Sequence, residues 1–255
     1  MEKIKEINNI ITKIKNNREF ELNLIITLPV LCFIKSNNLI SNEEFNMIIS
    51  DESLKIKELK HYSFNDFNKV SEKIDEYLST FTNQILKFLP KDADIQSIDF
   101  MLYELLVNIY KHSKFENAYI QIINESDEDI NICIFDNGIG IPKSFEDASI
   151  PSENDCEALF DSINGKTSDK EKYSLRGRGL NSTARITTLG LCGNMTIASG
   201  SGVCTVTKNG AKTYFNDHNI NGTFVILKIK NKKVDNIYKY LKFKNINKIE
   251  DDNNA

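Results

Sequence analysis

The chain has 255 residues, of which 40% are apolar and 27% are charged, so it is long enough to bury a full-sized core. Its formal charge of -4 comes from 32 basic and 36 acidic residues that are mixed along the sequence, which gives no reason to expect nucleic acid as a partner. The 5 cysteines form no Cys-x-x-Cys pair and mostly lie in apolar stretches, so they indicate reduced core residues rather than a zinc site.

The N-terminal part of the chain gives the weakest pattern. Its first residues form a charged amphipathic stretch that is unlike a signal peptide, and the apolar run at residues 22–34 is too short to span a bilayer. We therefore expect a cytoplasmic protein with no membrane partner. Residues 2–16 predict a short helix, residues 20–33 predict one or two strands broken near Pro29, and residues 41–59 are polar and weakly periodic.

Two helices are predicted next. Apolar residues recur at spacings of three and four across residues 64–89, which is typical of a long amphipathic helix, and Pro90 ends it. A second helix is predicted over residues 94–112. The recurring apolar positions of the first helix are Phe67, Val70, Ile74, Leu78, Phe81, Ile85 and Leu89.

Strands dominate the rest of the chain. Residues 118–123 and 130–135 are apolar strands joined by a turn that is too short for a crossover, so they predict an antiparallel hairpin and argue against a Rossmann fold. A long polar stretch, a helix over residues 179–189 and three further strands follow. These strands are predicted at residues 194–199, 203–215 with a turn at Asn209 and Gly210, and 223–230.

This order of elements predicts an α+β fold, in which a mixed, mostly antiparallel sheet carries helices on one face in a two-layer sandwich. We divide the chain into an N-terminal extension of undefined role at residues 1–60, a main domain at residues 61–232, and a charged helix with an acidic tail at residues 233–255.

Polar residues form one narrow stripe on the otherwise apolar helix at residues 94–112, namely Ser97, Glu104, Asn108 and Lys111. A polar stripe on a buried helix must line a cavity that holds water or a polar ligand. Glu104 and Asn108, which lie four residues apart, suit a magnesium ion and an attacking hydroxyl held together. The alternative is a pair of semi-buried polar residues that are satisfied within the fold.

The strand at residues 130–135 is followed by Asp136, Gly138 and Gly140. A carboxylate is thereby fixed beside a backbone that has no side-chain bulk, where a flat ring can lie. An ordinary Asp-Asn-Gly turn is the alternative. The apolar residues Ile139 and Ile141 favour the ring site, because a plain solvent turn would not select them.

Two further glycine motifs occur downstream. Gly177, Arg178 and Gly179 open the helix predicted at residues 179–189, so free backbone amides and an arginine would face a polyphosphate. Gly222 and Thr223 begin the last strand, and an ordinary strand start is the alternative interpretation there. A lone Gly-x-Gly motif is weak evidence, but its position after the Asp136 motif strengthens it.

Together, in this order and spacing, these motifs resemble the N, G1, G2 and G3 boxes of the GHKL ATP-binding superfamily, which includes gyrase-type ATPases, Hsp90, MutL, histidine-kinase catalytic domains and anti-sigma-factor kinases. The resemblance implies that Glu104 is a general base, that Asn108 binds Mg²⁺ bridging the ATP phosphates, and that Asp136 accepts a hydrogen bond from adenine. The nucleotide-binding positions that it implies are Asn108, Lys111, Asp136, Gly138, Gly140, Lys166, Gly177, Arg178, Gly179, Leu180 and Thr223.

The stretch between the second and third boxes resembles an ATP lid. Residues 143–175 are long and polar, as expected of a segment that orders over nucleotide, and Lys166 lies where it could reach the terminal phosphate. A solvated loop lysine is the alternative. Family members often carry another glycine after the leucine of the third box, whereas here Asn181 and Ser182 follow Leu180.

The resemblance implies an ATP-binding regulator, with Glu104 favouring ATPase or anti-sigma-type serine/threonine kinase activity on a partner regulatory protein. A non-enzymatic, ATP-gated interaction switch is the first alternative. The catalytic domain of a sensor histidine kinase is the second, although His61 is the sole candidate phosphoacceptor. The N-terminal extension is a candidate dimerisation element, which makes a homodimer one of the expected assemblies.

Overall fold

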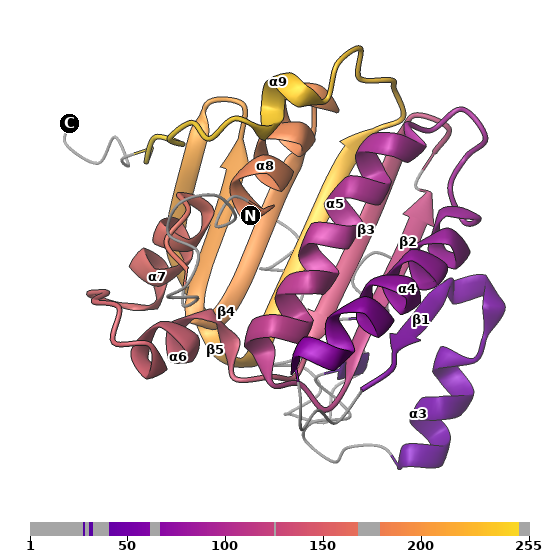
Figure 1. Ribbon diagram of the computed structural model, residues 1–255, viewed down its shortest axis with the longest axis horizontal. Helices are drawn as coiled ribbons and strands as arrows, with labels where there is room; N and C mark the ends of the chain where they lie inside the picture. Colours follow the sequence, from indigo (N-terminus) through magenta and orange to yellow (C-terminus); the bar gives the residue numbers. More distant parts are fainter. Residues whose placement is uncertain are drawn as a thin grey trace.

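The computed structural model describes residues 28, 31–32, 41–61, 67–124, 126–167 and 179–249. Its centre is a five-stranded sheet in the order β1-β2-β3-β5-β4, in which every neighbouring pair is antiparallel (Figure 1). The strands are β1 (Ile56–Leu59), β2 (Ala118–Asn124), β3 (Asp129–Asp136), β4 (Asn194–Thr207) and β5 (Gly210–Lys230). The register of β4 against β5 shifts between Ser199 and Gly202, within a stretch that the sequence predicted to separate two strands.

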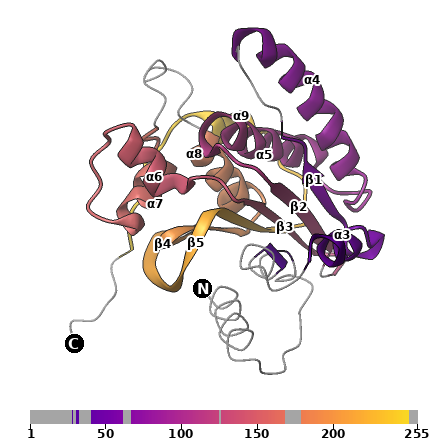
Figure 2. The same cartoon turned by 90° about the horizontal axis from the view of Figure 1, so that it is seen from below.

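Most helices cover one face of this sheet (Figures 1 and 2). They are α4 (Phe67–Leu86), α5 (Ile95–Asn108), α6 (Gly140–Asp147), α7 (Asp155–Ile163), α8 (Gly179–Arg185) and α9 (Tyr238–Leu241). Both α5 and α8 end in a π-helical turn, at Ile109–Ser113 and Ile186–Gly190 respectively. A further helix, α3 (Asn42–Ile49), lies on the opposite side of the sheet in Figure 2.

Helix α5 begins at a side-chain cap. The Asp94 carboxylate accepts hydrogen bonds from the Ser97 backbone N–H at 3.1 Å and from the Ser97 hydroxyl at 2.9 Å. The same carboxylate accepts a third bond from the Val234 N–H at 2.7 Å, which joins the start of α5 to the chain after β5. The cap satisfies an amide that would otherwise lack a partner in the first turn, and it fixes where α5 starts.

Alternate residues of the central strands pack into separate hydrophobic cores. Side chains such as Ile120 and Ile134 pack with α5 in the larger core. Their neighbours Tyr119 and Phe135 point to the opposite face, where they pack with Leu28 and Phe45. The sheet is therefore buried on both faces, which explains why β2 and β3 read as nearly continuous apolar runs.

A buried glutamine connects the N-terminal part of the chain to the second face of the sheet, which is the face that Phe45 covers. The Gln121 side chain is fully buried, accepts a hydrogen bond from the Leu28 N–H at 3.3 Å, and donates one to the Leu54 carbonyl at 3.0 Å. Strand β1, which also lies before residue 60, pairs with β2 at the edge of the sheet. Residues that precede the family-like motifs thus complete the sheet and cover it.

The predicted α+β fold and the hairpin of β2 and β3 are confirmed. Three local predictions are wrong. Residues 28, 31 and 32 are helical rather than extended, because a short apolar run fits a helix as well as a strand. Residues 143–163 contain α6 and α7 rather than only a polar loop, since Cys156, Leu159 and Ile163 are buried. The region after β5 holds a single short helix in its described part, followed by the extended residues 242–249.

No helix in the described part of the chain combines the length and the apolar character that crossing a bilayer requires.

If the second face is part of the folded core, truncating Phe45 must be costly. Phe45 is fully buried and meets Tyr119 edge-on, with ring centroids 5.5 Å apart. Phe45→Ala should lower the free energy of unfolding by about 3–5 kcal/mol, because it removes a large buried side chain and leaves a cavity. Urea denaturation followed by circular dichroism measures this change.

The matched control is Met47→Ala on the same helix, since Met47 is 69% exposed. This change should alter the free energy of unfolding by no more than about 0.5 kcal/mol. If Phe45→Ala lowered the free energy of unfolding by as little as Met47→Ala does, α3 would not contribute to the core.

Candidate functional site

Asp136 is a buried carboxylate at the end of the central strand β3. Its residue is 3% exposed, and its Oδ1 accepts a hydrogen bond from the Gly138 N–H at 2.9 Å. The strand registers place Ala118 on one side of Asp136 and Thr223 on the other, and Ser199 lies beyond Thr223. The strand pairing therefore brings the predicted residues Asp136, Gly138 and Thr223 together at one edge of the sheet.

Burial raises the pKa of Asp136 from an ordinary 3.8 to about 7, because the charged carboxylate loses its hydration. The Gly138 N–H and the nearby Ser113 hydroxyl lower the pKa, but by less than burial raises it. The Ser113 hydroxyl oxygen Oγ is itself buried, and it makes no hydrogen bond of acceptable geometry within the described residues. A carboxyl kept in such a place without a cationic partner in these contacts is suited to a neutral, polar ligand group.

The loop after Asp136 needs its glycines because the backbone passes close to other elements. A Cβ on Gly138 would collide with the backbone of Ser113, and the Ile139 N–H donates to the Ser113 carbonyl at 2.7 Å. Gly140 has a φ of 77°, and a Cβ there would lie 2.5 Å from the Ser199 Oγ. Glycine is favoured at Gly140 for both conformational and steric reasons.

Ser199 anchors the other side of this loop. Its hydroxyl donates to the Gly222 carbonyl at 2.6 Å and accepts from the Ile141 N–H at 3.0 Å. The start of α6 is thereby joined to β4 and β5. The loop that carries Gly138 and Gly140 is held between the end of the α5 segment and the two C-terminal strands, next to the Asp136 carboxylate.

Glu104 lies on α5 against the first residue of α8. The Gly179 Cα is so close to the Glu104 carboxylate that a Cβ at this position would collide with Oε2. Glu104 is half-buried, and Leu180, the next residue of α8, packs on the larger core. A half-buried carboxylate and a helix start that lacks side-chain bulk therefore lie against each other.

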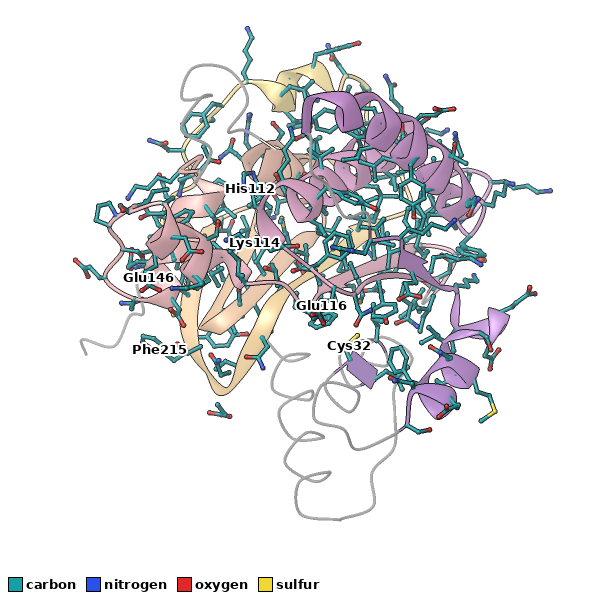
Figure 3. The ribbon with its side chains drawn as sticks, turned by 60° about the horizontal axis from the view of Figure 1, so that its bottom comes forward. Cys32, His112, Lys114, Glu116, Glu146 and Phe215 are labelled. Carbon is teal, nitrogen blue, oxygen red and sulfur yellow. The ribbon has the colours of Figure 1, made fainter. Side chains whose placement is uncertain are left out.

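Asn108 and Lys111 continue from Glu104 toward Asp136. Asn108 is the last residue of α5, one turn after Glu104, and it is half-buried. Lys111 is exposed in the π-helical turn Ile109–Ser113, whose last residue lies beside Gly138. Figure 3 shows His112 and Lys114 on the chain that leads from α5 toward β2, with Cys32 on the other side of the sheet. The helix end therefore connects Glu104 to the Asp136 loop.

A family model described as histidine kinase-, DNA gyrase B-, and HSP90-like ATPase matches residues 93–232, which is more than half of the chain. The match includes Glu104, Asn108, Asp136, Gly179 and Thr223. The chain belongs to this ATPase family. Among curated proteins, none matches it. The predicted GHKL resemblance is thus confirmed, and the chain is an ATP-binding protein of the histidine kinase-like type.

The residues of this ATPase-family site fit a magnesium ion that is bound mainly by phosphate. No cluster of three or more His, Cys, Asp or Glu side chains suits a metal in the parts of the chain that the structure describes. Magnesium typically takes one or two protein oxygens and completes its shell with water and substrate phosphates. Asn108, one turn after Glu104 on α5, offers one oxygen of that kind.

For three predicted positions, the described residues show no contact with the Asp136 site. Lys166 is exposed, and its ammonium pairs with the Asp161 carboxylate of α7 at 2.5 Å, so its described contacts are away from Asp136. Gly177 and Arg178 lie outside the described residues. Their roles and that of Lys166 stay predictions.

Ser113 and Ser199 are site residues that the sequence analysis missed. Ser113 directly follows His112 at the end of the first motif, so its position next to the predicted helix end was the available signal. Ser199 offered no local signal, because its role depends on the pairing of β4 with β5, which brings it level with Thr223.

The raised pKa of Asp136 predicts a pH dependence of stability. Between about pH 4 and pH 7 the folded protein retains a proton that the unfolded chain has lost, so raising the pH through this window lowers the free energy of unfolding. Asp136→Asn keeps the shape and removes the titration. From pH 5 to pH 8, the wild type should lose about 2–3 kcal/mol relative to this variant.

Urea denaturation of both proteins at the two pH values measures this difference. All other titrating groups are shared, so they cancel in the comparison. The same pH dependence in wild type and variant would show that the Asp136 carboxyl keeps an ordinary pKa in the fold.

Proposed function

We propose that this ATP-binding protein is a regulator that transfers the γ-phosphate of ATP to a serine or threonine hydroxyl of a partner protein. The observation that carries this proposal is the Glu104 carboxylate, which lies half-buried against Gly179 and one turn before Asn108. A carboxylate in that position is a suitable general base for a hydroxyl nucleophile.

In this proposal the adenine ring lies beside Asp136, and its exocyclic amine donates a hydrogen bond to the carboxylate. The glycines of the adjoining loop let its backbone pack closely against Ser113 and Ser199, which holds this loop beside the carboxylate. Thr223, which pairs with Asp136 across the strands, lies at the same edge. The polyphosphate then extends along Lys111 and Asn108 toward Glu104 and the start of α8.

Transfer requires a hydroxyl that loses its proton as it attacks. Glu104 accepts this proton while the hydroxyl oxygen bonds to the γ-phosphorus, and the bond to the β–γ bridging oxygen breaks to release ADP. Asn108 would hold magnesium, which supplies charge neutralisation to the phosphates when bound. With water in place of the hydroxyl, the same residues would hydrolyse ATP slowly.

An ATP-gated switch without transfer is the second candidate, because α6 begins directly at Gly140 and so links the nucleotide loop to the surface. The sensor-kinase alternative finds less support. His61 precedes α4 and packs edge-on against Phe115, with ring centroids 5.3 Å apart, so its ring is engaged within the domain. A homodimer stays a proposal. The sheet face near Phe224 is already covered within the chain by Leu28, Cys32 and Phe45, so it is not open to a second copy.

Glu104→Gln separates the two candidates. Glutamine keeps the shape that packs against Gly179 but cannot accept the proton, so phosphate transfer or release should fall by about 100-fold or more while ATP affinity is retained. The rate is measured with γ-labelled ATP and magnesium, and affinity is measured by calorimetry on the same samples.

Glu116→Gln is the matched control, since Glu116 is exposed on the loop between the π-helical turn and β2. It should leave both quantities unchanged. Undiminished turnover in Glu104→Gln would rule out the general-base role, and ATP binding without turnover in the wild type would favour the switch.

A further inference from the structure

The C-terminal residues 242–249, which we call the C-terminal strap, bind in an extended form across α7, α8 and the start of β5. In Figure 1 they follow α9 as the yellow chain that runs past α8 toward the C-terminus. The Ala211 N–H donates to the Asn247 carbonyl at 2.8 Å, and the Ile249 N–H donates to the Ala211 carbonyl at 2.7 Å. The strap thereby forms a parallel bridge with β5 at Ala211.

Two asparagine side chains hold alternate residues of the strap by their main chain. Asn164, just after α7, accepts from the Ile246 N–H at 2.8 Å and donates to the Ile246 carbonyl at 3.2 Å. Asn181 of α8 does the same for Lys244, donating to its carbonyl at 3.0 Å and accepting from its N–H at 3.5 Å. Each amide side chain pairs with the strap main chain as a neighbouring strand would, through one donor and one acceptor.

Further contacts fix both ends of the strap. The Arg185 guanidinium of α8 donates to the Tyr240 carbonyl at 2.9 Å and to the Lys242 carbonyl. The Lys248 ammonium pairs with the Glu157 carboxylate of α7. Gly210 leaves space for the strap, since a Cβ there would lie 2.6 Å from the Asn247 carbonyl oxygen. These contacts come from three separate elements, so the strap joins them.

Asn181 connects the strap to the site. Its Nδ2 also donates to the Ile163 carbonyl at the end of α7, at 3.0 Å, and its residue is fully buried. It lies two residues after Gly179, which contacts the Glu104 carboxylate.

We propose that the C-terminal strap, through Asn164, Asn181 and Arg185, positions α8 against Glu104 and thereby sets the affinity for the phosphates of ATP. These three are positioning residues, since none of them contacts the Asp136 loop. The inference rests on the proposed placement of the phosphates beside Asn108, Glu104 and the start of α8. It does not depend on whether the phosphate is transferred.

The test uses the full chain with Ile246→Pro, because proline removes the N–H that donates to Asn164. The affinity for ATP with magnesium should fall by about fivefold or more, a typical coupling between linked sites. The affinity for adenosine, which lacks phosphates and contacts only the Asp136 side, should not change. A merely structural weakening of the fold would not separate the two ligands in this way.

Phe243→Pro is the control for proline itself. The preceding Lys242 already has φ −70° and ψ 128°, an extended conformation that the residue before a proline favours, and the Phe243 N–H makes no hydrogen bond within the described residues. Asn164→Asp is a second test variant, in which a carboxylate faces the Ile246 carbonyl, and its control is Asn245→Asp at an exposed strap position. Both controls should bind ATP as the wild type does.

ATP affinity equal to that of the wild type in Ile246→Pro and in Asn164→Asp would overturn the positioning role and leave ATP binding intact. Parallel loss of ATP and adenosine affinity would also overturn it. If the wild type bound ATP no more tightly than adenosine, the result would instead refute the proposed placement of the phosphates. Should Ile246→Pro fail to fold, Asn164→Asp gives the same comparison with a smaller change to the backbone.

Discussion

The buried carboxylate of Asp136 is the constraint on which the rest of the site depends. A carboxylate at the end of a central strand costs free energy unless a ligand or a hydrogen bond offsets its lost hydration. The surrounding backbone provides one N–H, from Gly138 of the glycine loop. The loop, its anchor at Ser199 and the turn at Ser113 all contribute to keeping that arrangement.

The sheet beneath the site is rigid because it is covered on both faces. Helices α4, α5 and α8 cover one face, while Leu28, Cys32 and Phe45 pack on the other. The N-terminal part of the chain is thus an integral part of this structure, since it contributes β1 and 5 of the 12 buried residues of the second core. The register of these strands, in turn, places Asp136, Thr223 and Ser199 side by side.

Local patterns predicted the elements that depend on short-range spacing. The apolar recurrence of α4, the short turn between β2 and β3 and the motif residues Glu104 and Asp136 were all readable, because their signals lie within a few residues. The covering of the second face was not, since Gln121 and Leu28 are far apart in sequence and meet only in the fold. Residues 242–249 looked helical and charged, yet side chains from α7 and α8 hold them extended.

The central claim is that Asp136 binds the adenine of ATP, and calorimetric titration of wild type and Asp136→Asn with ATP and magnesium tests it most directly. GTP serves as the ligand control, because guanine presents a carbonyl where adenine presents an amine. The account predicts that the wild type binds ATP in preference to GTP and that Asp136→Asn binds ATP at least about tenfold more weakly, as expected for loss of a hydrogen bond to a charged group. Equal ATP affinity in the two proteins would contradict it.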